Sequence, residues 1–300
     1  MEVESRSTTR KVIIDVICLA CVGFPLLFFY LFGSPYQRGL FCNDESIRYP
    51  FKDSTVTSFM LYFIGLVLPI CLFLVVEWIH YRSGESHANR KVTFNGRNVH
   101  PWVWRCYCVI GVFGFGAACS QLLTDIAKYT IGRLRPHFWS VCQPSIDCSL
   151  PQYQNTYIID FTCKGDNARL IREGRLSFLS GHSSFSAYTM VFLVLYLQCR
   201  VYWRGSHLIR HFAQFICISM AWFTALSRVS DYKHHWSDVL AGSLLGTTVA
   251  IVVVKFVSNL RLDDVKIYKP AATSSDDAQN HGVNLTVSGQ RWHAISQQAE

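Results

Sequence analysis

Two histidines and one aspartate in this sequence have the chemistry needed for nucleophilic and acid–base reactions. His234 and Asp238 are four residues apart, and on a helix this spacing places both side chains on one face. The carboxylate could then hold one imidazole N–H and leave the other nitrogen unprotonated, as a base or a nucleophile. His182 stands at the start of an apolar segment, where it could supply a proton or be an ordinary interfacial histidine. The two histidines suffice for a nucleophile and a general acid.

Three cations lie at the ends of apolar segments near these histidines. Lys128 and Arg135 are about two helical turns apart, so they can project the same way if the helix continues between them. Arg228 follows the fifth apolar segment. The alternative for Lys128 and Arg135 is a structural role as interfacial cations. Together with Arg228 they can offset the charge of a phosphate dianion.

Ser180 and Gly181 precede His182 and form the expected start of a membrane helix. The free N–H groups of a helix N-terminus bind anions, and a glycine lets the backbone approach a ligand closely. The Ser180 hydroxyl could bind a ligand oxygen or could simply cap the helix. We therefore expect an anion site here, with both roles open for Ser180.

The same residues do not form a metal-binding pattern. The acidic groups expected near the cations are Asp231 and Asp238, which are too few for a two-metal site. One histidine–carboxylate pair is also too few ligands for zinc, and the sequence contains neither HExxH nor paired CxxC. His235 points about 100° away from His234 on a helix and is expected to be structural. We therefore expect chemistry without a metal or another cofactor.

The elements that must position these residues are membrane helices. The chain has 300 residues, of which 50% are hydrophobic and 16% are charged, whereas a soluble domain is about 25% charged. Its apolar residues form blocks of about 20, long enough to cross a bilayer as a helix. The six blocks are Val12–Phe32, Ser58–Ile79, Val103–Ala127, Ser183–Cys199, Phe212–Leu226 and Val239–Val257. We therefore predict an all-α, polytopic membrane protein with six transmembrane helices in a bundle.

The short loops set the expected orientation of this bundle. Lys and Arg are frequent between the second and third blocks and between the fourth and fifth, and such loops face the cytoplasm. Residues 1–11 are then a cytoplasmic N-terminus, 12–260 the membrane domain and 261–300 a polar cytoplasmic tail that we expect to be disordered. The residues singled out above all fall at the opposite, non-cytoplasmic face. The net charge of +8 is spread through the loops, so we expect contact with the lipid bilayer and none with nucleic acid.

The twelve cysteines divide into two groups. Eight fall in or beside the apolar blocks and are expected to be small core residues. Cys42, Cys142, Cys148 and Cys163 fall in the outward segments, where an oxidising compartment permits disulfides. A bridge among the last three is one option, and the sequence leaves the pairing open. The one glycosylation sequon, at Asn284, falls in the cytoplasmic tail, where it would stay unmodified.

Three ordered stretches resemble the motifs of one enzyme superfamily. KYTIGRLRP fits KxxxxxxRP, LSGH fits PSGH, and SRVSDYKHHWSD fits SRxxxxxHxxxD; these are motifs of the type 2 phosphatidate phosphatase superfamily. The stretches GLFCNDESIRYPF, RLSFLSGHSSFS and SRVSDYKHHWSDVLAG are similar to those of its integral-membrane lipid phosphate phosphatases. The resemblance covers roughly residues 10–260. Leu179 departs from the motif proline, and the family's outward-loop glycosylation site is absent.

The resemblance implies a role for each candidate residue. The residues that it assigns to phosphate binding are Lys128, Arg135, Arg228, Ser180 and Gly181. His234 would be the nucleophile, and Asp238 would orient it. His182 would protonate the leaving lipid alkoxide and then activate the water that breaks the phosphohistidine.

The resemblance also implies hydrolysis of lipid phosphate monoesters without a metal. The expected substrates are phosphatidate, lysophosphatidate, sphingosine 1-phosphate and ceramide 1-phosphate. The site would be extracellular or luminal, in the plasma membrane or alternatively in the endoplasmic reticulum or Golgi, and a homo-oligomer is compatible with it. Two alternatives are a lipid phosphotransferase of the same superfamily and a non-enzymatic protein that only binds lipid phosphates. The intact His182, Arg228 and His234 favour an enzyme over the second alternative.

Overall fold

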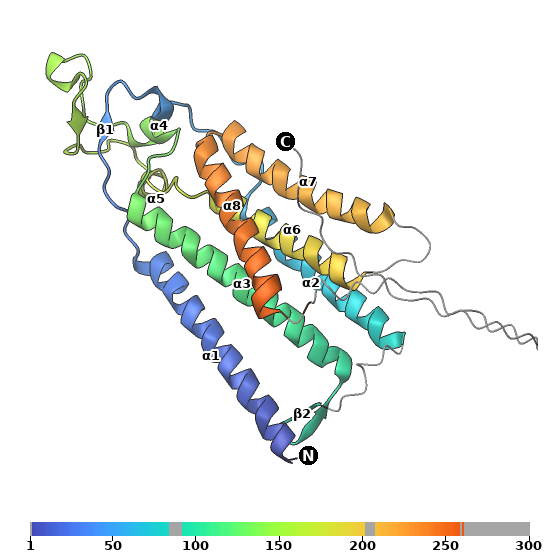
Figure 1. Cartoon of the computed structure of the whole chain (residues 1–300). Helices are drawn as coiled ribbons and strands as arrows, with labels where there is room; N and C mark the ends of the chain where they lie inside the picture. The colour runs from blue at the N-terminus through green and yellow to red at the C-terminus, as the bar shows by residue number, and fades with distance from the viewer. Residues whose placement is uncertain (1, 84–91, 202–207, 259, 261–300) are drawn as a thin grey trace, which may run out of the picture. The chain divides into compact units, whose positions relative to one another are not determined.

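Six long helices make up most of the described residues in the computed structural model (Figure 1), which describes residues 2–83, 92–201, 208–258 and 260. They are α1 (Glu2–Phe32), α2 (Ser58–Arg82), α3 (Pro101–Ile131), α6 (Gly181–Arg200), α7 (Leu208–Ser230) and α8 (Trp236–Val252), and α8 passes into a π-helix, η4 (Val253–Val257). The predicted disordered tail, 261–300, and its sequon lie outside the described residues.

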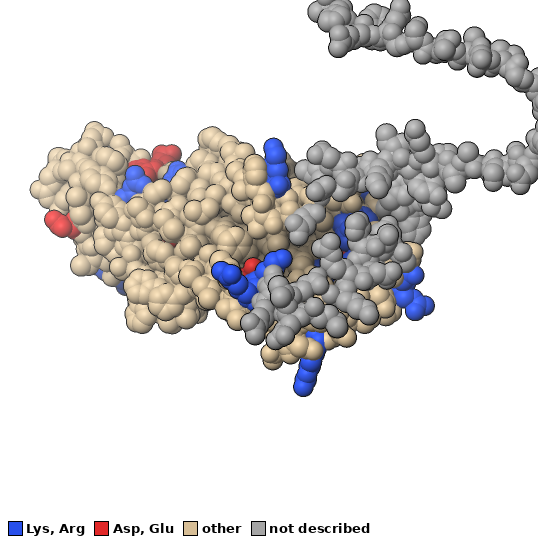
Figure 2. Space-filling model, turned by 60° about the horizontal axis from the view of Figure 1, so that its bottom comes forward, with Lys and Arg blue, Asp and Glu red and all other residues tan. Residues whose placement is uncertain are grey.

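Five of these helices are long and apolar enough to cross a membrane, namely α1 from Thr8, α2, α3, α7 and α8 with η4. Large apolar side chains cover their outer faces; Phe24 of α1 is 71% exposed and Phe212 of α7 is 64% exposed. Figure 2 shows a broad surface of the described residues that few Lys, Arg, Asp or Glu side chains interrupt. The prediction of an all-α, polytopic membrane protein is therefore confirmed, whereas the count of six spans stays a prediction.

Helix α6, the fourth predicted span, packs against four other helices: α2, α3, α7 and α8. Its first turns carry Ser183, Ser184 and Ser186, and all three are buried. Small polar residues suit a helix that faces other helices rather than lipid, because they allow close approach and hydrogen bonding. From Tyr188 onward the helix carries the aromatic core, in which Tyr188, Phe192 and Tyr196 are fully buried.

Two glycines of α8 bring this helix into backbone contact with α6. A Cβ at Gly242 would lie 2.6 Å from the backbone oxygen of Ser180, and one at Gly246 would collide with the backbone oxygen of Ser184. No side chain larger than hydrogen fits at either position without moving a helix. The starts of α6 and α8 are therefore held together, and both carry predicted site residues.

Residues 33–57 and 132–180 form a cap of short elements at one end of the helices (Figure 1). The cap contains β1 (Leu40–Phe41), η1 (Glu45–Ile47), α4 (Phe138–Cys142), η3 (Pro151–Tyr153), β4 (Tyr157–Ile158) and α5 (Ala168–Glu173). β1 pairs antiparallel with β4, with Leu40 opposite Ile158. Near the other end, a hairpin of β2 (Val92–Phe94) and β3 (Arg97–Val99) precedes α3.

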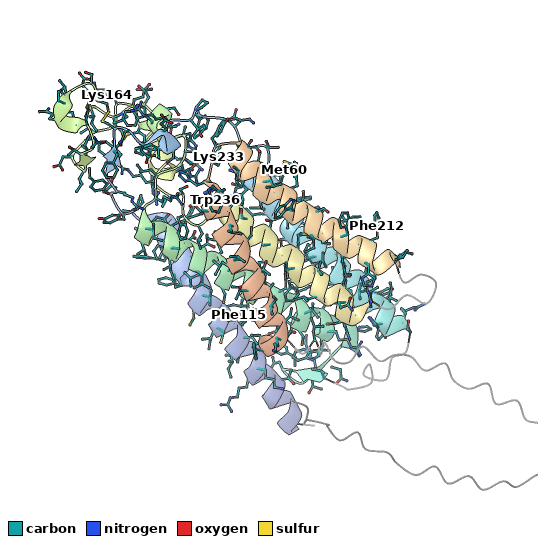
Figure 3. All side chains as sticks on the ribbon, turned by 45° about the horizontal axis from the view of Figure 1, so that its top comes forward. Met60, Phe115, Lys164, Phe212, Lys233 and Trp236 are labelled. Atoms are coloured by element: carbon teal, nitrogen blue, oxygen red, sulfur yellow. A yellow bond between two sulfur atoms is a disulfide. The ribbon has the colours of Figure 1, made fainter. Side chains whose placement is uncertain are left out.

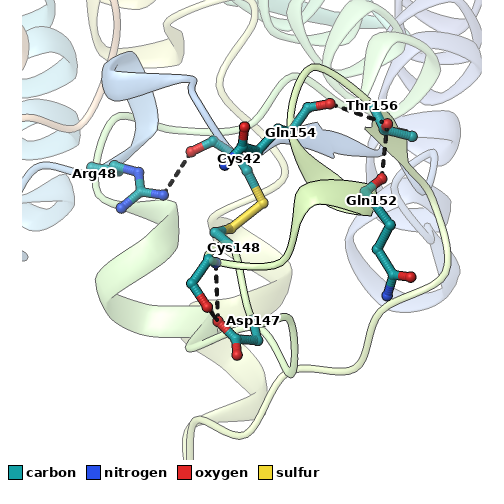
Figure 4. The surroundings of a disulfide bond; sticks show 8 residues. Cys42, Arg48, Asp147, Cys148, Gln152, Gln154 and Thr156 are labelled. Atoms are coloured by element: carbon teal, nitrogen blue, oxygen red, sulfur yellow. Dashed lines mark hydrogen bonds between the residues drawn. A yellow bond between two sulfur atoms is a disulfide. The ribbon is translucent and has the colours of Figure 1, made fainter.

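Two disulfides fasten the cap. Cys142 pairs with Cys163, and Cys148 pairs with Cys42. The first bridge is one of the options predicted among Cys142, Cys148 and Cys163, whereas the second joins Cys148 to residues 33–57 of the cap. Figure 4 shows the Cys42–Cys148 bridge, where the guanidinium of Arg48 donates to the backbone oxygen of Cys42 at 2.7 Å. Both segments of the cap must lie on the same side of a membrane, because a covalent bond joins them.

The other eight cysteines are free. Cys106 and Cys217 are buried, as expected of small core residues, whereas Cys18, Cys21 and Cys71 are exposed on the outer faces of α1 and α2. The interpretation of all eight as core residues is therefore wrong. An apolar helix surface that faces lipid accepts a thiol as readily as a core does, and the sequence does not separate the two.

Candidate active site

The predicted site residues lie where α3, α6, α7 and α8 reach the cap. The ammonium of Lys128, near the end of α3, faces the start of α6, since a Cβ at Gly181 would lie 2.9 Å from Lys128 Nζ. The backbone N–H of Ser180 donates to the backbone oxygen of Asp238 at 3.1 Å. These contacts join three segments that are far apart in the sequence.

Lys128 and Arg135 do not lie on one continuous helix. α3 ends at Ile131, and Gly132 has a φ of +59°, a left-handed conformation that glycine adopts without strain. Arg135 lies beyond this turn, and its backbone N–H donates to the oxygen of Gly174 at 2.8 Å. The predicted helical alignment is therefore wrong, yet the charges of Lys128 and Arg135 both act on His234.

Ser180 caps α6. Its hydroxyl oxygen accepts hydrogen bonds from the backbone N–H of Ser183 at 3.4 Å and from the Ser183 hydroxyl at 2.9 Å, and the Ser180 side chain is fully buried. Of the two roles left open for this residue, the structure contains the cap. Gly181 follows, and its missing side chain leaves room for the ammonium of Lys128.

Arg228 is held by a segment that the sequence analysis did not single out, residues 52–56. This arginine lies in the last turn of α7 and is 2% exposed. Its guanidinium donates to the backbone oxygen of Val56 at 3.2 Å and to the hydroxyl of Ser54 at 3.3 Å. The Nε of Arg228 is buried and has no partner within the described part of the chain. One face of this cation is fixed by the protein and another is left for a ligand.

Asp231 anchors the same segment. Its carboxylate accepts hydrogen bonds from the backbone N–H of Thr55 at 2.7 Å and from the Thr55 hydroxyl at 2.8 Å, and it lies 3.8 Å from the Arg228 guanidinium. Asp231 is fully buried, and the hydrogen bonds from Thr55 help to lower its pKa against the effect of burial. This carboxylate therefore stabilises the 52–56 segment and is not an open acid of the site.

His234 lies just before α8, in the turn that follows α7. The backbone N–H groups of Lys233 and His234 both donate to the oxygen of Arg228, at 3.1 and 3.2 Å. Its Nδ1 lies 2.7 Å from the backbone oxygen of Ser177. Because a carbonyl oxygen only accepts, Nδ1 carries the hydrogen, and the lone pair of the neutral imidazole is on Nε2.

Burial lowers the pKa of His234 well below its ordinary value, and the charges of Arg135, Lys128 and Arg228 lower it further. His234 is 3% exposed. Three cations therefore lie within electrostatic range of a neutral imidazole with one free lone pair. This is the electronic state that a nitrogen nucleophile requires.

The predicted direct contact between Asp238 and His234 is not present among the described residues. The capping residue of α8 is His235, so His234 precedes the helix and the four-residue spacing does not align the two side chains. The Asp238 carboxylate accepts instead from the hydroxyl of Ser177 at 2.6 Å, from the guanidinium of Arg133, and from the backbone N–H of His235 at 3.2 Å. His235 caps α8, and its Nδ1 lies 3.2 Å from the Asp238 carboxylate.

His182 is the second residue of α6 and lies beside Val56 of the 52–56 segment. One ring nitrogen hydrogen-bonds the backbone of Val56, while Nε2 is buried without a partner in the described part of the chain. The Nε atoms of Arg135 and Arg228 are also buried without a hydrogen-bond partner in the described part of the chain. Buried polar atoms are costly to leave unpaired, so these three atoms together indicate a place for a polar ligand.

Aromatic residues of the cap support the turn that carries His234. Tyr49 stacks on Tyr232 with ring centroids 4.6 Å apart, and the ammonium of Lys233 lies 3.8 Å from the ring centroid of Phe51. Burial, together with the nearby arginines, lowers the pKa of Lys233 to about 8. Figure 3 shows Lys233 and Trp236 where α7 gives way to α8, with Lys164 farther out in the cap.

No group of three His, Cys, Asp or Glu side chains is arranged to hold a metal ion among the residues that the structure describes. Two acids beside the site have other partners, since Asp231 holds Thr55 and Asp238 holds Ser177. The expected independence of metal and cofactor stays a prediction.

Comparison with known proteins places the sequence of this chain in one family. The sequence pattern of the PAP2 superfamily matches residues 110–262. The chain is 53% identical over 261 residues to a Drosophila melanogaster protein named "Putative phosphatidate phosphatase", covering 83% of this chain and 69% of that one. It is 45% identical to Phospholipid phosphatase 1 of Rattus norvegicus, with 83% and 85% of the chains covered.

Phospholipid phosphatase 2 of Homo sapiens is 42% identical, and the match covers 83% of each chain. No solved structure matches the chain. The chain belongs to the PAP2 superfamily. The resemblance to integral-membrane lipid phosphate phosphatases that its motifs carry is thereby confirmed.

The sequence analysis missed the residues that hold the site together. Ser177 and Arg133 lie inside the quoted stretches RLSFLSGHSSFS and KYTIGRLRP, so their positions beside the candidate residues were a usable signal. Ser54 and Val56 had no such signal, because they act across more than 170 residues of sequence.

Proposed function

We propose that the protein is a membrane phosphatase that hydrolyses lipid phosphate monoesters. The observation that carries this proposal is the convergence of Lys128, Arg135 and Arg228 on the neutral imidazole of His234. Three cations can neutralise a phosphate dianion, and the free Nε2 lone pair can attack its phosphorus. The names of the relatives, phosphatidate phosphatase and phospholipid phosphatase, support a lipid ester as the substrate.

In the proposed reaction, His234 Nε2 forms a bond to phosphorus as the bond from phosphorus to the lipid oxygen breaks. The leaving alkoxide takes a proton from His182, and negative charge from the bound dianion favours the protonated form of that imidazole. His182, now neutral, then accepts a proton from a water molecule whose oxygen attacks the phosphohistidine. The products are the dephosphorylated lipid and inorganic phosphate, and both histidines return to their starting states.

We further propose that all six long helices span the membrane, with the site on the non-cytoplasmic face. The Cys42–Cys148 bridge supports this, since it requires an even number of crossings between its cysteines, and α2 and α3 supply two. Disulfides persist in oxidising compartments, which favours an extracellular or luminal cap. The plasma membrane fits these conditions, and the endoplasmic reticulum and Golgi are the alternatives.

A decisive experiment measures phosphate release by the purified protein in EDTA with phosphatidate, lysophosphatidate, sphingosine 1-phosphate and ceramide 1-phosphate. We expect turnover of at least one lipid without metal, and inhibition by vanadate, which adopts the geometry of phosphoryl transfer. Loss of activity in EDTA that Mg²⁺ restores would contradict the metal-free mechanism. A lipid phosphotransferase is the second candidate, and it would consume diacylglycerol in preference to water as the acceptor.

A further inference from the structure

A carboxylate lies inside the third spanning helix, below the proposed phosphate site. Asp125 precedes Lys128 by three residues in α3, and its side chain is 20% exposed. Ionisable groups within spanning helices are costly and therefore mark functional sites by default. The sequence analysis did not single out this residue, and the proposed reaction does not use it.

The partners of Asp125 do not satisfy it well. Its Oδ1 lies 3.9 Å from Lys128 Nζ and 3.5 Å from Gln121 Nε2, and both distances are at the outer limit for such contacts. The other amide atom of Gln121, Oε1, is buried and has no hydrogen-bond partner among the described residues. The unpaired oxygen of Gln121 and the weakly paired carboxylate of Asp125 therefore belong to residues one helical turn apart on α3.

These polar groups lie in an aromatic setting. Tyr62 of α2 is within electrostatic range of Asp125, and its ring packs edge to face on Phe185 of α6, with centroids 4.9 Å apart. Phe185 follows Gly181 by one helical turn on α6. Asp125 therefore occupies a layer about one turn deeper in the helices than the place where Lys128 faces Gly181.

The spacing between this layer and the phosphate site matches the chemistry of lipid phosphates. Three residues of helix correspond to a rise of about 4.5 Å from Asp125 to Lys128. In a lipid phosphate monoester, the substituent on the second backbone carbon is four bonds from phosphorus, a reach of roughly 4–5 Å for bonds of about 1.5 Å. A phosphate held by the three cations therefore places that substituent near Asp125.

We propose that Asp125, assisted by Gln121, forms a subsite that binds the polar group next to the phosphate ester and favours lipids with a free ammonium there. This inference rests on the proposed function, since it assumes that a lipid phosphate occupies the site. The cations lie near the cap, and the Asp125 carboxylate lies one helical turn deeper. This order complements a headgroup whose phosphate is outermost and whose ammonium lies closer to the acyl chain. A substrate with a hydroxyl at this carbon would donate a hydrogen bond to the carboxylate but would lack the attraction between two opposite charges.

The test compares three substrates that differ in the substituent at that carbon. Sphingosine 1-phosphate carries a free ammonium, whereas in ceramide 1-phosphate the same nitrogen is an uncharged amide; hexadecyl phosphate has no substituent there. The variant is Asp125→Asn, which keeps the shape of the side chain and removes its charge. The matched control is Asp160→Asn, which removes the charge of an exposed aspartate in the cap.

We expect Asp125→Asn to lower the ratio of kcat/KM for sphingosine 1-phosphate to that for ceramide 1-phosphate by at least about 10-fold, in line with the loss of a charge-assisted contact. Asp160→Asn should leave this ratio unchanged. Gln121→Leu should lower it by a smaller factor, and the vanadate inhibition constant should stay as in the wild type, which reports an intact phosphate site.

An equal loss on all three substrates would mean that Asp125 acts only through Lys128, and would overturn the inference. An unchanged ratio would overturn it as well. If the wild-type protein releases phosphate from none of the three lipids, the proposed function itself fails. This failure can be told apart from a failure of the Asp125 proposal, because the ratio of kcat/KM values is compared only after turnover by the wild-type protein has been measured.

Discussion

The imidazole of His234 is held by Ser177, whose backbone oxygen lies 2.7 Å from Nδ1. The hydroxyl of the same serine donates to the Asp238 carboxylate at 2.6 Å, and its backbone N–H donates to the oxygen of Arg133 at 3.0 Å. Ser177 is fully buried. The acid that would orient the nucleophile is therefore coupled to it through one intervening residue.

This relationship predicts that Ser177 and Asp238 act as one unit. Ser177→Ala removes the hydroxyl that fixes Asp238 but keeps the carbonyl that fixes His234, so we expect kcat to fall about 10-fold with little change in KM. Asp238→Asn should be more damaging, because it also weakens the contact with Arg133. Since both variants break one network, the double variant should be no slower than Asp238→Asn alone. Multiplicative losses would show that the two residues act independently, and Ser177→Thr should restore part of the rate.

The two histidines should differ in their dependence on the leaving group. Protonation by His182 is worth roughly 10²–10⁴-fold for a poor leaving group such as an alkoxide, and much less for an acidic phenol. We expect His182→Ala to lose turnover of lipid phosphates yet form phosphohistidine from an aryl phosphate, and this adduct should persist because water lacks its base. His234→Ala should form no adduct from either substrate. Acid-quench trapping of labelled phosphoenzyme measures both, and an adduct in His234→Ala but not in His182→Ala would reverse the assignment.

The lowered pKa of His234 predicts how activity responds to acid. Burial and then the charge of Arg135 disfavour the imidazolium, so the nucleophile stays neutral and active at pH values below 6.5. Arg135→Gln removes a positive charge and should raise this pKa, which moves the acidic limb of the kcat/KM profile to higher pH. The profiles of the wild type and the variant are measured with the same substrate, so that the ionisation of the substrate affects both equally. An acidic limb that stays in place would show that His234 does not control it.

The proposed topology predicts which loops are accessible from outside. The test introduces single cysteines in place of Gln154 in the cap and Asn95 in the β2–β3 hairpin, which are both exposed. The background protein has its free thiols replaced and its disulfides kept. In intact cells, an impermeant thiol reagent should label only the cysteine at 154. Labelling at both positions before the cells are opened, or at 95 alone, would contradict a non-cytoplasmic site.

The chain segments that form the site were predictable from the sequence, because their motifs stand at the ends of apolar blocks and an even number of crossings brings them to one face. The contacts between them were not. Whether His234 belongs to α8 depends on which residue caps that helix, and the capping pair of His235 and Asp238 decides it. Arg228 takes its acceptors from Val56 and Ser54, which no local pattern relates to it.

The same limit applies to α6 and to the disulfides. Serines in the first turns of α6 make it less apolar than the other long helices, yet it packs against four of them. Its burial depends on neighbours that the sequence alone does not provide. The partner of Cys148 likewise depends on how the two segments of the cap fold against each other.

The Cys42–Cys148 bridge also imposes an order on the making of the protein. The two cysteines are 106 residues apart, so at a synthesis rate of about 5–20 residues per second Cys148 is made roughly 5–20 s after Cys42. Cys42 must wait with a free thiol until α2 and α3 have been inserted, whereas Cys142 and Cys163, 21 residues apart, can pair within one stretch of newly made chain. The cap is therefore closed only after half of the chain has been inserted, and a nascent protein carries an unfinished site until then.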